Sequence, residues 1–313
     1  MKIAVIGPGA MGCLLAASLC EANEVWLLDH DSDRANLLNR RGLVVEENGR
    51  SRSCRVNVTV NSRLIGPVDL ILLCVKSGKV KEALQAVRPL CNKDSLLIAL
   101  QNGIGHLSLL PEILGDTVCW GLGVTSHGAT LIGPGHVLHK GQGLTRIGLP
   151  SPAIVTNSES RGKLALAAQT LTGGGIETEL VSDILNHVWT KLLVNVGINA
   201  LTAINDCPNG VLLESPETVA IMHAAILEGQ HVAEKSDITL TDNPLQVTLK
   251  VCRATAANIS SMLQDIRAKR PTEIDAINGA LVLKGVELGI PTPVNKELVR
   301  KVKGIERNYN DFT

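Results

Sequence analysis

The sequence predicts an α/β fold, with a Rossmann-type, doubly wound N-terminal domain followed by an all-α C-terminal domain. Short apolar runs alternate with segments of helical spacing in the first half of the chain. A glycine-rich turn follows the first apolar run, and strand-like runs fade after about residue 180. Because 313 residues suffice for two ordinary domains, we expect one domain over residues 1–180 and another over 181–313.

The N-terminal half has the pattern of a parallel sheet with crossover helices. Strand-like runs occupy residues 2–6 and 24–28, and continuous apolar runs typical of strands buried on both faces occupy residues 68–75 and 95–100. Helical spacing covers residues 10–22, 33–41, 79–87 and 162–172. The pair Asn48-Gly49 predicts a hairpin between residues 44–46 and 55–60. The Gly- and Thr-rich stretch 121–147 predicts antiparallel strands at the sheet edge.

The C-terminal half carries helical patterns only. They cover residues 184–204, 217–235, 244–263 and 272–288. The many Leu and Val residues in these helices suit a domain core, and they also leave open a homodimer whose interface they would form.

The overall composition argues against several classes of protein. Lys plus Arg and Asp plus Glu are 30 each, so the chain lacks the basic excess of a nucleic-acid or membrane-surface binder. The longest apolar stretch, Leu70 to Val75, is far shorter than the ~20 residues of a membrane helix. The eight cysteines form no Cys-x-x-Cys pair, which favours reduced thiols, a cytoplasmic location and no metal site.

The turn Gly7-Pro8-Gly9-Ala10-Met11-Gly12 is the first candidate functional feature. It follows a predicted strand and opens a predicted helix. Gly7 permits the tight turn, Gly9 lets the backbone approach a pyrophosphate, and Gly12 lets helix and strand pack closely. The helix N-terminus presents free N–H groups to the phosphates. In this context the turn predicts a dinucleotide-binding domain, and we expect the chain to be a nicotinamide-dependent oxidoreductase.

Asp29 ends the second predicted strand and bears on the choice of nicotinamide cofactor. An aspartate here would accept hydrogen bonds from the adenine-ribose hydroxyls and favour NAD. It would repel the 2′-phosphate of NADP by about 3 kcal/mol at ~5 Å and an effective dielectric of ~20. Four neighbouring basic residues could offset that repulsion, namely His30, Arg34, Arg40 and Arg41.

Lys76 and Asn102 follow two further predicted strands. In an open α/β sheet, ligands bind outside the carboxyl ends of the strands. We therefore expect both side chains to point at the cofactor crevice.

Lys191, Asn195 and Asn199 form a polar stripe on an otherwise apolar predicted helix. Their spacing of four residues places them on one face. A cation and two amides on such a helix are costly unless a partner or ligand satisfies them. The stripe is therefore a candidate substrate site, with a solvent-facing stripe as the alternative.

Several longer motifs accompany these features. They are Asn102-Gly103-Ile104-Gly105, the segment from Trp189 to Ile204, Cys207-Pro208-Asn209-Gly210, the segment from Asn258 to Arg267, and Thr272-Glu273-Ile274-Asp275. Together with the glycine turn they resemble the ketopantoate reductase (2-dehydropantoate 2-reductase) family along nearly the whole chain. Spacing alone does not join Lys191, Ser261 and Glu273 into one site, whereas the resemblance does.

The resemblance implies NADPH-dependent reduction of 2-dehydropantoate to (R)-pantoate, a step toward pantothenate and coenzyme A. It implies that Lys191 donates the proton, with Glu273 at the catalytic and cofactor centre, and that Asn102 touches both cofactor and substrate. Other substrate residues would be Asn195, Asn199, Asn209 and Ser261. Other cofactor residues would be Lys76, Ala129 and the turn from Gly7 to Gly12, with Asp29 and His30 at the ribose. His127 also matches, without an assigned role.

The family pattern usually has a basic residue where this chain has His30. We expect NADPH, because His30 and Arg34 are close, with NAD as the alternative because of Asp29. Two other functions stay open at this point. One is a reductase of a different 2-keto or β-hydroxy acid, and the other is a non-catalytic NAD(P)-sensing regulatory protein.

Overall fold

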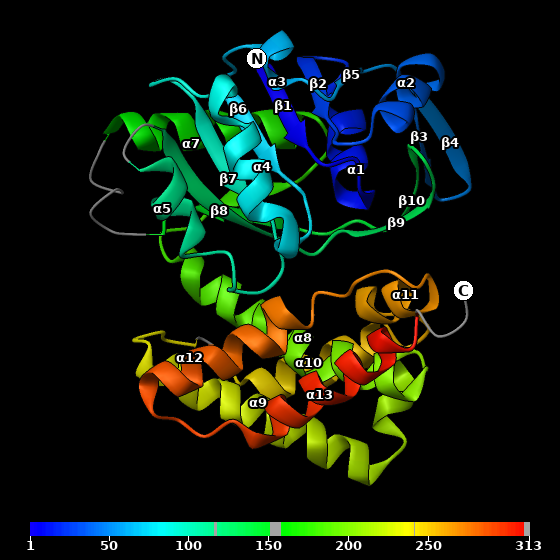
Figure 1. The fold of residues 1–313 in the computed structure, drawn as a ribbon, viewed down its shortest axis with the longest axis vertical. Helices are drawn as coiled ribbons and strands as arrows, with labels where there is room; N and C mark the ends of the chain where they lie inside the picture. Colours follow the sequence, from blue (N-terminus) through cyan, green and yellow to red (C-terminus); the bar gives the residue numbers. More distant parts are fainter. Residues whose placement is uncertain (116–117, 151–157, 241, 310–313) are drawn as a thin grey trace. The chain divides into compact units, whose positions relative to one another are not determined.

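The computed structural model describes residues 1–115, 118–150, 158–240 and 242–309 (Figure 1). The chain divides into two compact units. The N-terminal unit comprises Met1–Gln101 and Leu107–Ile184, and the C-terminal unit comprises Asn102–His106 and Leu185–Thr313. The short segment 102–106 thus groups with the C-terminal helices, which a single division near residue 180 does not convey.

The N-terminal unit is built on an eight-stranded sheet of order β12-β11-β8-β7-β6-β1-β2-β5. Its strands are β1 (Lys2–Ile6), β2 (Glu24–Leu28), β5 (Asn57–Thr59), β6 (Leu70–Leu73), β7 (Leu96–Ala99), β8 (Cys119–Thr125), β11 (Thr145–Gly148) and β12 (Thr178–Leu180). All neighbours from β5 to β8 are parallel. Their order is that of a doubly wound dinucleotide-binding sheet, so the predicted Rossmann-type fold is confirmed.

Helices cover both faces of this sheet. They are α1 (Ala10–Leu19), α2 (Ser32–Arg41), α3 (Ser62–Ile65), α4 (Val80–Ala86), α5 (Leu109–Leu114) and α7 (Ser158–Gly173). Helix α1 packs against α7, and α4 packs against α5. Figure 1 shows α4 in front of strands β6 and β7, with α7 behind the sheet. The core between these layers is apolar, because strands such as β1 and β6 are buried along almost their whole length.

A second, four-stranded sheet of order β4-β3-β10-β9 corrects two expectations. Its strands are β3 (Leu43–Glu47), β4 (Arg50–Cys54), β9 (Gly128–Gly133) and β10 (His136–Gly141). Asn48-Gly49 does form a hairpin turn, but its second strand is β4 and not residues 55–60. Residues 57–59 instead pair with β2 in the main sheet. Within 121–147, only β11 lies antiparallel in the main sheet, while β9 and β10 pair in the small one.

The described part of the C-terminal unit is helical, as predicted. Its helices are α8 (Ile184–Asn205), α9 (Pro216–Lys235), α10 (Pro244–Ala254), α11 (Ser261–Arg267), α12 (Ala280–Leu288) and α13 (Pro293–Arg307), with a short 3-10 turn at Asn209–Leu213 and a π-helical turn at Asp275–Gly279. The expected helix over 244–263 is wrong, because α10 ends at Ala254 and α11 begins at Ser261. Among the described helices, none combines the length and apolarity needed to span a membrane.

Candidate active site

The glycine turn joins β1 to α1, and two of its glycines are required by the fold. Gly7 has a φ of +100°, and its N–H donates to the carbonyl oxygen of Leu28 at 3.0 Å. A Cβ on Gly12 would lie 2.0 Å from the carbonyl oxygen of Gly7. Glycine at position 12 therefore lets α1 begin close against the turn.

Gly9 is not required by the packing of the protein itself. A Cβ at this residue would meet no atom within 4 Å. Gly9 is the exposed N-cap of α1 and supplies no side-chain cap. The N-cap residue therefore has no side chain that covers the first N–H groups of the helix. Such N–H groups attract anions. The turn, with Pro8, Ala10 and Met11 beside Gly9, therefore fits the pyrophosphate of a dinucleotide.

The carboxylate of Asp29, just after β2, is occupied by groups of this chain. It accepts hydrogen bonds from the N–H groups of His30 at 2.6 Å and Asp31 at 3.1 Å. Nε of Arg34 donates to Oδ2 at 2.7 Å, and Nη2 of the same guanidinium donates to Oδ1. The Asp29 side chain is fully buried, and its hydrogen bond raises the pKa of Arg34. The negative charge at this corner is therefore already paired with a cation.

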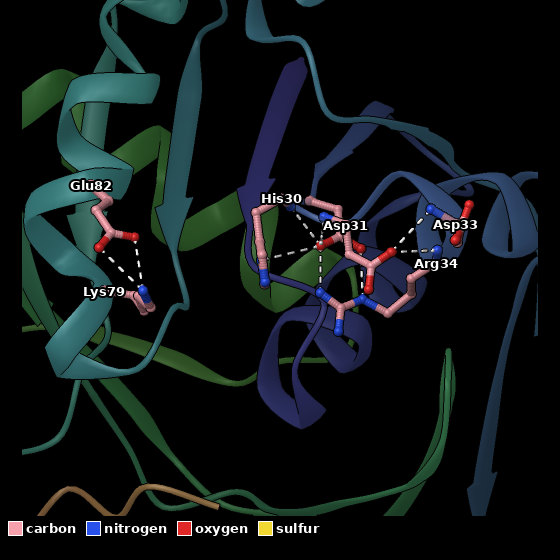
Figure 2. A network of polar contacts seen from close by, with 7 residues as sticks. His30, Asp31, Asp33, Arg34, Lys79 and Glu82 are labelled. Carbon is pink, nitrogen blue, oxygen red and sulfur yellow. Dashed lines mark hydrogen bonds and ion pairs between the residues drawn. The ribbon is translucent and has the colours of Figure 1, made fainter.

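Figure 2 shows the groups that surround this ion pair at the start of α2. Asp31 caps the helix, because its carboxylate accepts hydrogen bonds from the N–H groups of Asp33 and Arg34, both at 3.0 Å. The His30 side chain is 86% exposed at the same corner. Arg40 and Arg41 are exposed in the last turn of α2. Of the four basic residues expected to balance Asp29, the structure thus places Arg34 directly on it.

Other predicted cofactor residues lie near the ends of further strands. Lys76 is exposed and begins a short 3-10 turn after β6. His127 follows β8, and Ala129 lies in β9, where it pairs with His139 of β10. Because β1, β6 and β8 are parallel, their carboxyl ends share one sheet edge with the glycine turn. Lys76 and His127 therefore belong to the edge at which such sheets bind ligands.

In the C-terminal unit, helix α8 carries the polar stripe. Lys191 and Asn195 are partly buried and Asn199 is 5% exposed, so the alternative of a solvent-facing stripe is wrong. The buried side chains of α8 that form the core on its other faces include Leu192, Leu193 and Val196. Burial lowers the pKa of Lys191 to about 8, and the nearby negative charge of Glu273 opposes that decrease. The stripe therefore holds an amine that can release a proton near neutral pH.

Asn102 and Glu273 meet although 171 positions separate them in the chain. Nδ2 of Asn102 donates to Oε2 of Glu273 at 3.2 Å. The N–H of Ile104 donates to the carbonyl oxygen of Ala276, which anchors the segment 102–106 to the π-helical turn that follows Glu273. The C-terminal unit therefore brings together Asn102, Glu273 and, through its electrostatic interaction, Lys191.

Asn209 has a buried polar atom without a hydrogen-bond partner in the described part of the chain. Its Nδ2 donates to Oγ1 of Thr255 at 2.9 Å, and its N–H donates to the carbonyl oxygen of Asn258 at 3.0 Å. Its Oδ1 is buried, and none of the described residues offers it a hydrogen bond. Because an unsatisfied buried acceptor is costly, this oxygen is a candidate acceptor for a ligand hydroxyl.

The two serines of the Asn258–Arg267 motif have separate roles. Both were expected inside one helix, but Ser260 is the N-cap of α11, and its Oγ accepts a hydrogen bond from the N–H of Leu263 at 3.1 Å. The Ser260 hydroxyl also contacts the Thr202 hydroxyl at 2.6 Å. Ser261, the first residue of α11, is exposed. Ser260 thus serves the fold, whereas Ser261 is free to face a ligand.

Some supporting residues were not predicted. Thr255 and Asn258 accept hydrogen bonds from Asn209, and the Thr202 hydroxyl contacts that of Ser260, the residue before Ser261. The sequence carries a partial signal for Ser260, because a serine directly before a segment of helical spacing is typical of a helix N-cap. The pairing of Asn209 with Thr255 joins distant segments and has no local signal.

Comparisons with known proteins cover both units. The family model "Ketopantoate reductase PanE/ApbA" matches residues 3–152, and its C-terminal counterpart matches residues 183–306. A 2-dehydropantoate 2-reductase from Halobacterium salinarum is 34% identical over 98% of this chain and 100% of its own length. One from Vibrio cholerae is 32% identical over 99% of both chains.

Solved structures agree with these relatives and add a second enzyme. A PanE/ApbA family ketopantoate reductase from Ralstonia eutropha has a TM-score of 0.88 and 29% identity, with 99% of both chains covered. A D-mandelate dehydrogenase with NADH and anilino(oxo)acetate has a TM-score of 0.89 and 28% identity over the same share of both chains. With two family models covering most of its length, this chain belongs to the ketopantoate reductase (PanE/ApbA) family of oxidoreductases.

Proposed function

We propose that this chain reduces 2-dehydropantoate to (R)-pantoate with NADPH, a step in pantothenate and coenzyme A biosynthesis. The observation that carries the proposal is the partly buried Lys191. Burial lowers its pKa to about 8, and the negative charge of Glu273 limits that decrease. The experiment that tests it is turnover of the purified chain with both reactants, followed by chiral identification of the product. NADPH consumption without (R)-pantoate, or no consumption, would contradict the proposal.

Lys191 supplies the proton that the reduced ketone needs. Bound NADPH provides the hydride that is added to the keto carbon. The protonated Nζ of Lys191 stabilises the negative charge that develops on the ketone oxygen and then donates its proton there. With a pKa of about 8, Lys191 is about nine-tenths protonated at pH 7.

The amides near Lys191 suit the rest of the substrate. Asn195, Asn199 and Asn102 can bind the carboxylate without adding a charge that competes with Lys191. The buried Oδ1 of Asn209 is a hydrogen-bond acceptor, and the 4-hydroxyl of 2-dehydropantoate can donate a hydrogen bond to it. Ser261 is the remaining substrate contact in this proposal.

A second candidate substrate is an aryl keto acid, which is favoured by the similarity to D-mandelate dehydrogenase. Phenylglyoxylate, the keto acid that corresponds to mandelate, carries no hydroxyl group. It would leave Oδ1 of Asn209 buried and without a donor, which costs about 1–3 kcal/mol. The contacts of Asn209 therefore favour 2-dehydropantoate.

We further propose that the protein is cytoplasmic and that its binding partner is the keto acid substrate. A homodimer is compatible with this proposal.

The cofactor choice gives a first prediction. Because Arg34 already neutralises Asp29, a 2′-phosphate would meet a guanidinium and the exposed His30 instead of an unpaired carboxylate. We expect a higher kcat/KM with NADPH than with NADH. Arg34→Gln should lower the NADPH-to-NADH ratio of kcat/KM at least ~10-fold, since a charge-assisted hydrogen bond contributes about 1.5–3 kcal/mol.

Arg40→Gln is the matched control, because Arg40 is exposed at the far end of the same helix. It should leave the ratio unchanged. A wild-type preference for NADH would mean that Asp29 binds the ribose hydroxyls, and Asp29→Ala should then weaken that preference. An unchanged ratio in Arg34→Gln would show that Arg34 does not contact the 2′-phosphate.

The pH dependence gives a second prediction. Lys191 is protonated below its pKa of about 8, so kcat/KM for reduction should fall as the pH rises through that value. Burial lowers this pKa, and the charge of Glu273 raises it. Glu273→Gln removes the charge but keeps an oxygen that can accept the hydrogen bond from Asn102. The descending limb should therefore move to lower pH.

The measurement is the pH profile of kcat/KM for the wild type and for Glu273→Gln. Glu287→Gln is the control, because Glu287 is an exposed residue of α12 that pairs with Lys284. That profile should coincide with the wild type. A limb that stays in place in Glu273→Gln, or moves to higher pH, would contradict the electrostatic role of Glu273.

A further inference from the structure

Two buried histidines and a glutamate form a hydrogen-bonded chain in the N-terminal unit that the proposed mechanism does not use. Nδ1 of His127 lies 3.0 Å from Nε2 of His139, and Nδ1 of His139 lies 2.9 Å from Oε1 of Glu47. His127 is 8% exposed and His139 7%. Glu47, at the end of β3, is the outermost member, with a side chain 33% exposed. The chain therefore runs from a surface carboxylate to a buried imidazole.

The carboxylate sets the direction of these hydrogen bonds. An ionised carboxylate only accepts, so Nδ1 of His139 carries the hydrogen that is donated to Glu47. In a neutral His139, Nε2 is then a lone pair, and Nδ1 of His127 must donate to it. His127 is thus held as the Nδ1–H tautomer, and its Nε2 is an acceptor.

That Nε2 atom is buried and has no hydrogen-bond partner among the described residues. Burial and the neighbouring His139 lower the pKa of His127, while Glu47 and Glu177 raise it. A neutral His127 therefore presents a buried acceptor without a donor. This indicates that a group other than the described residues donates a hydrogen bond to Nε2.

The position of His127 in the sheet indicates which donor this is. His127 follows β8, the sixth strand of the doubly wound order, whereas Asp29 follows β2 in the other half of the sheet. In such folds the two halves of a dinucleotide bind to the two halves of the sheet. The half that contains β6, β7 and β8 therefore receives the nicotinamide, whose carboxamide carries N–H donors. The carboxylate and ketone of a keto acid carry none, and the one donor of 2-dehydropantoate, its 4-hydroxyl, is proposed above to bind Asn209.

We propose that His127 is a cofactor-positioning residue: its Nε2 accepts a hydrogen bond from the nicotinamide carboxamide, and His139 and Glu47 hold it in the required tautomer. This inference rests on the proposed use of a nicotinamide cofactor. It does not depend on which keto acid is reduced. The hydrogen bond would fix the rotation of the nicotinamide ring and so the face that the ring presents.

The test compares NADPH with its 3-acetylpyridine analogue, which lacks the carboxamide N–H groups. Dissociation constants are measured on the full chain by titration without substrate. The wild type should bind NADPH about 5- to 50-fold more tightly than the analogue, as expected for a buried acceptor that loses its donor. In His127→Phe the two dissociation constants should become nearly equal, because NADPH loses the hydrogen bond and the analogue has none to lose.

A milder variant guards against a folding defect. Glu47→Gln keeps both histidines but removes the charge that sets the tautomer, and it should reduce the discrimination about 2- to 10-fold. Glu46→Gln is the matched control. Glu46 is the neighbour of Glu47 in β3, and it contacts His136 at 2.8 Å outside the chain of His127. The Glu46→Gln variant should show the same ratio of the two dissociation constants as the wild type.

Equal discrimination in the wild type and in both the His127→Phe and Glu47→Gln variants would overturn the inference. So would a 15N spectrum of the NADPH complex that shows His127 as the Nε2–H tautomer. Neither result would touch the proposed function, which turnover of 2-dehydropantoate by the wild type tests separately.

Discussion

Replacement of Lys191 by alanine is expected to lower kcat about 10²–10⁴-fold, the usual span for the loss of a general acid. Lys191 is the cation in the polar stripe of α8, and its pKa of about 8 leaves it protonated at pH 7. Without it, the charge on the ketone oxygen has neither its stabilising partner nor its proton source. The measurement is steady-state reduction of 2-dehydropantoate at saturating NADPH, together with the dissociation constant for NADPH.

The dissociation constant should change little, because the groups proposed to bind the cofactor phosphates belong to the glycine turn. Lys284→Ala is the control, since Lys284 is a surface lysine of α12 that pairs with Glu287. It should keep the wild-type kcat. An unchanged kcat in Lys191→Ala would remove Lys191 from the mechanism.

Two variants in the glycine turn are expected to separate effects on protein stability from effects on cofactor affinity. Gly12→Ala would place a Cβ 2.0 Å from the carbonyl oxygen of Gly7. Such overpacking costs about 1–3 kcal/mol of unfolding free energy, which the better helix propensity of alanine offsets by at most about 1 kcal/mol. Thermal unfolding without cofactor should therefore show a lower Tm, and NADPH binding should be lost or strongly weakened.

Gly9→Ala is the matched variant, because its Cβ would meet no atom within 4 Å and its φ of −77° suits alanine. Its Tm without cofactor should equal that of the wild type, while NADPH should bind at least ~10-fold more weakly, about 1.4 kcal/mol. Wild-type NADPH affinity in Gly9→Ala would show that the pyrophosphate does not approach this residue.

The strands that are buried on both faces were predictable from the sequence. Strands β6 and β7 lie within the predicted apolar runs, because every residue of each strand is apolar and buried. Strand β4 gave no such signal. Four of its five residues are exposed, and pairing with β3 behind the Asn48-Gly49 turn stabilises it without burial.

The helical half shows where local patterns stop being sufficient. The stretch 244–263 has helical spacing throughout, yet the chain leaves the helix after Ala254. The segment after α10 bonds to the turn of Asn209, where the carbonyl oxygens of Ala256 and Asn258 accept hydrogen bonds. Those contacts join residues about 50 positions apart, so no local propensity reports them. Helix α13 was also not predicted, although Pro293 at its start and the buried Leu298 and Val302 are helical signals.

The candidate site was predictable as residue types but not as contacts. Lys191, Asn195 and Asn199 stand out because polar groups on an apolar helix need a reason. The bidentate pairing of Asp29 with Arg34 was only one of several ways to balance that charge, and the structure selects it. The link between Asn102 and Glu273 depends on tertiary structure alone. Membership of the ketopantoate reductase family shows that the chain is an oxidoreductase, so the alternative of a non-catalytic sensor does not fit.

The identity of the substrate can be tested by comparing kcat/KM for three keto acids. NADPH-dependent reduction is measured with 2-dehydropantoate, with 2-ketoisovalerate and with phenylglyoxylate. Neither alternative substrate carries the hydroxyl that Oδ1 of Asn209 is proposed to bind. The cost of about 1–3 kcal/mol for leaving this oxygen without a donor corresponds to about 5- to 150-fold, so 2-dehydropantoate should have a kcat/KM higher than either by about that factor. A kcat/KM for phenylglyoxylate or 2-ketoisovalerate that equals or exceeds that for 2-dehydropantoate would contradict the assignment.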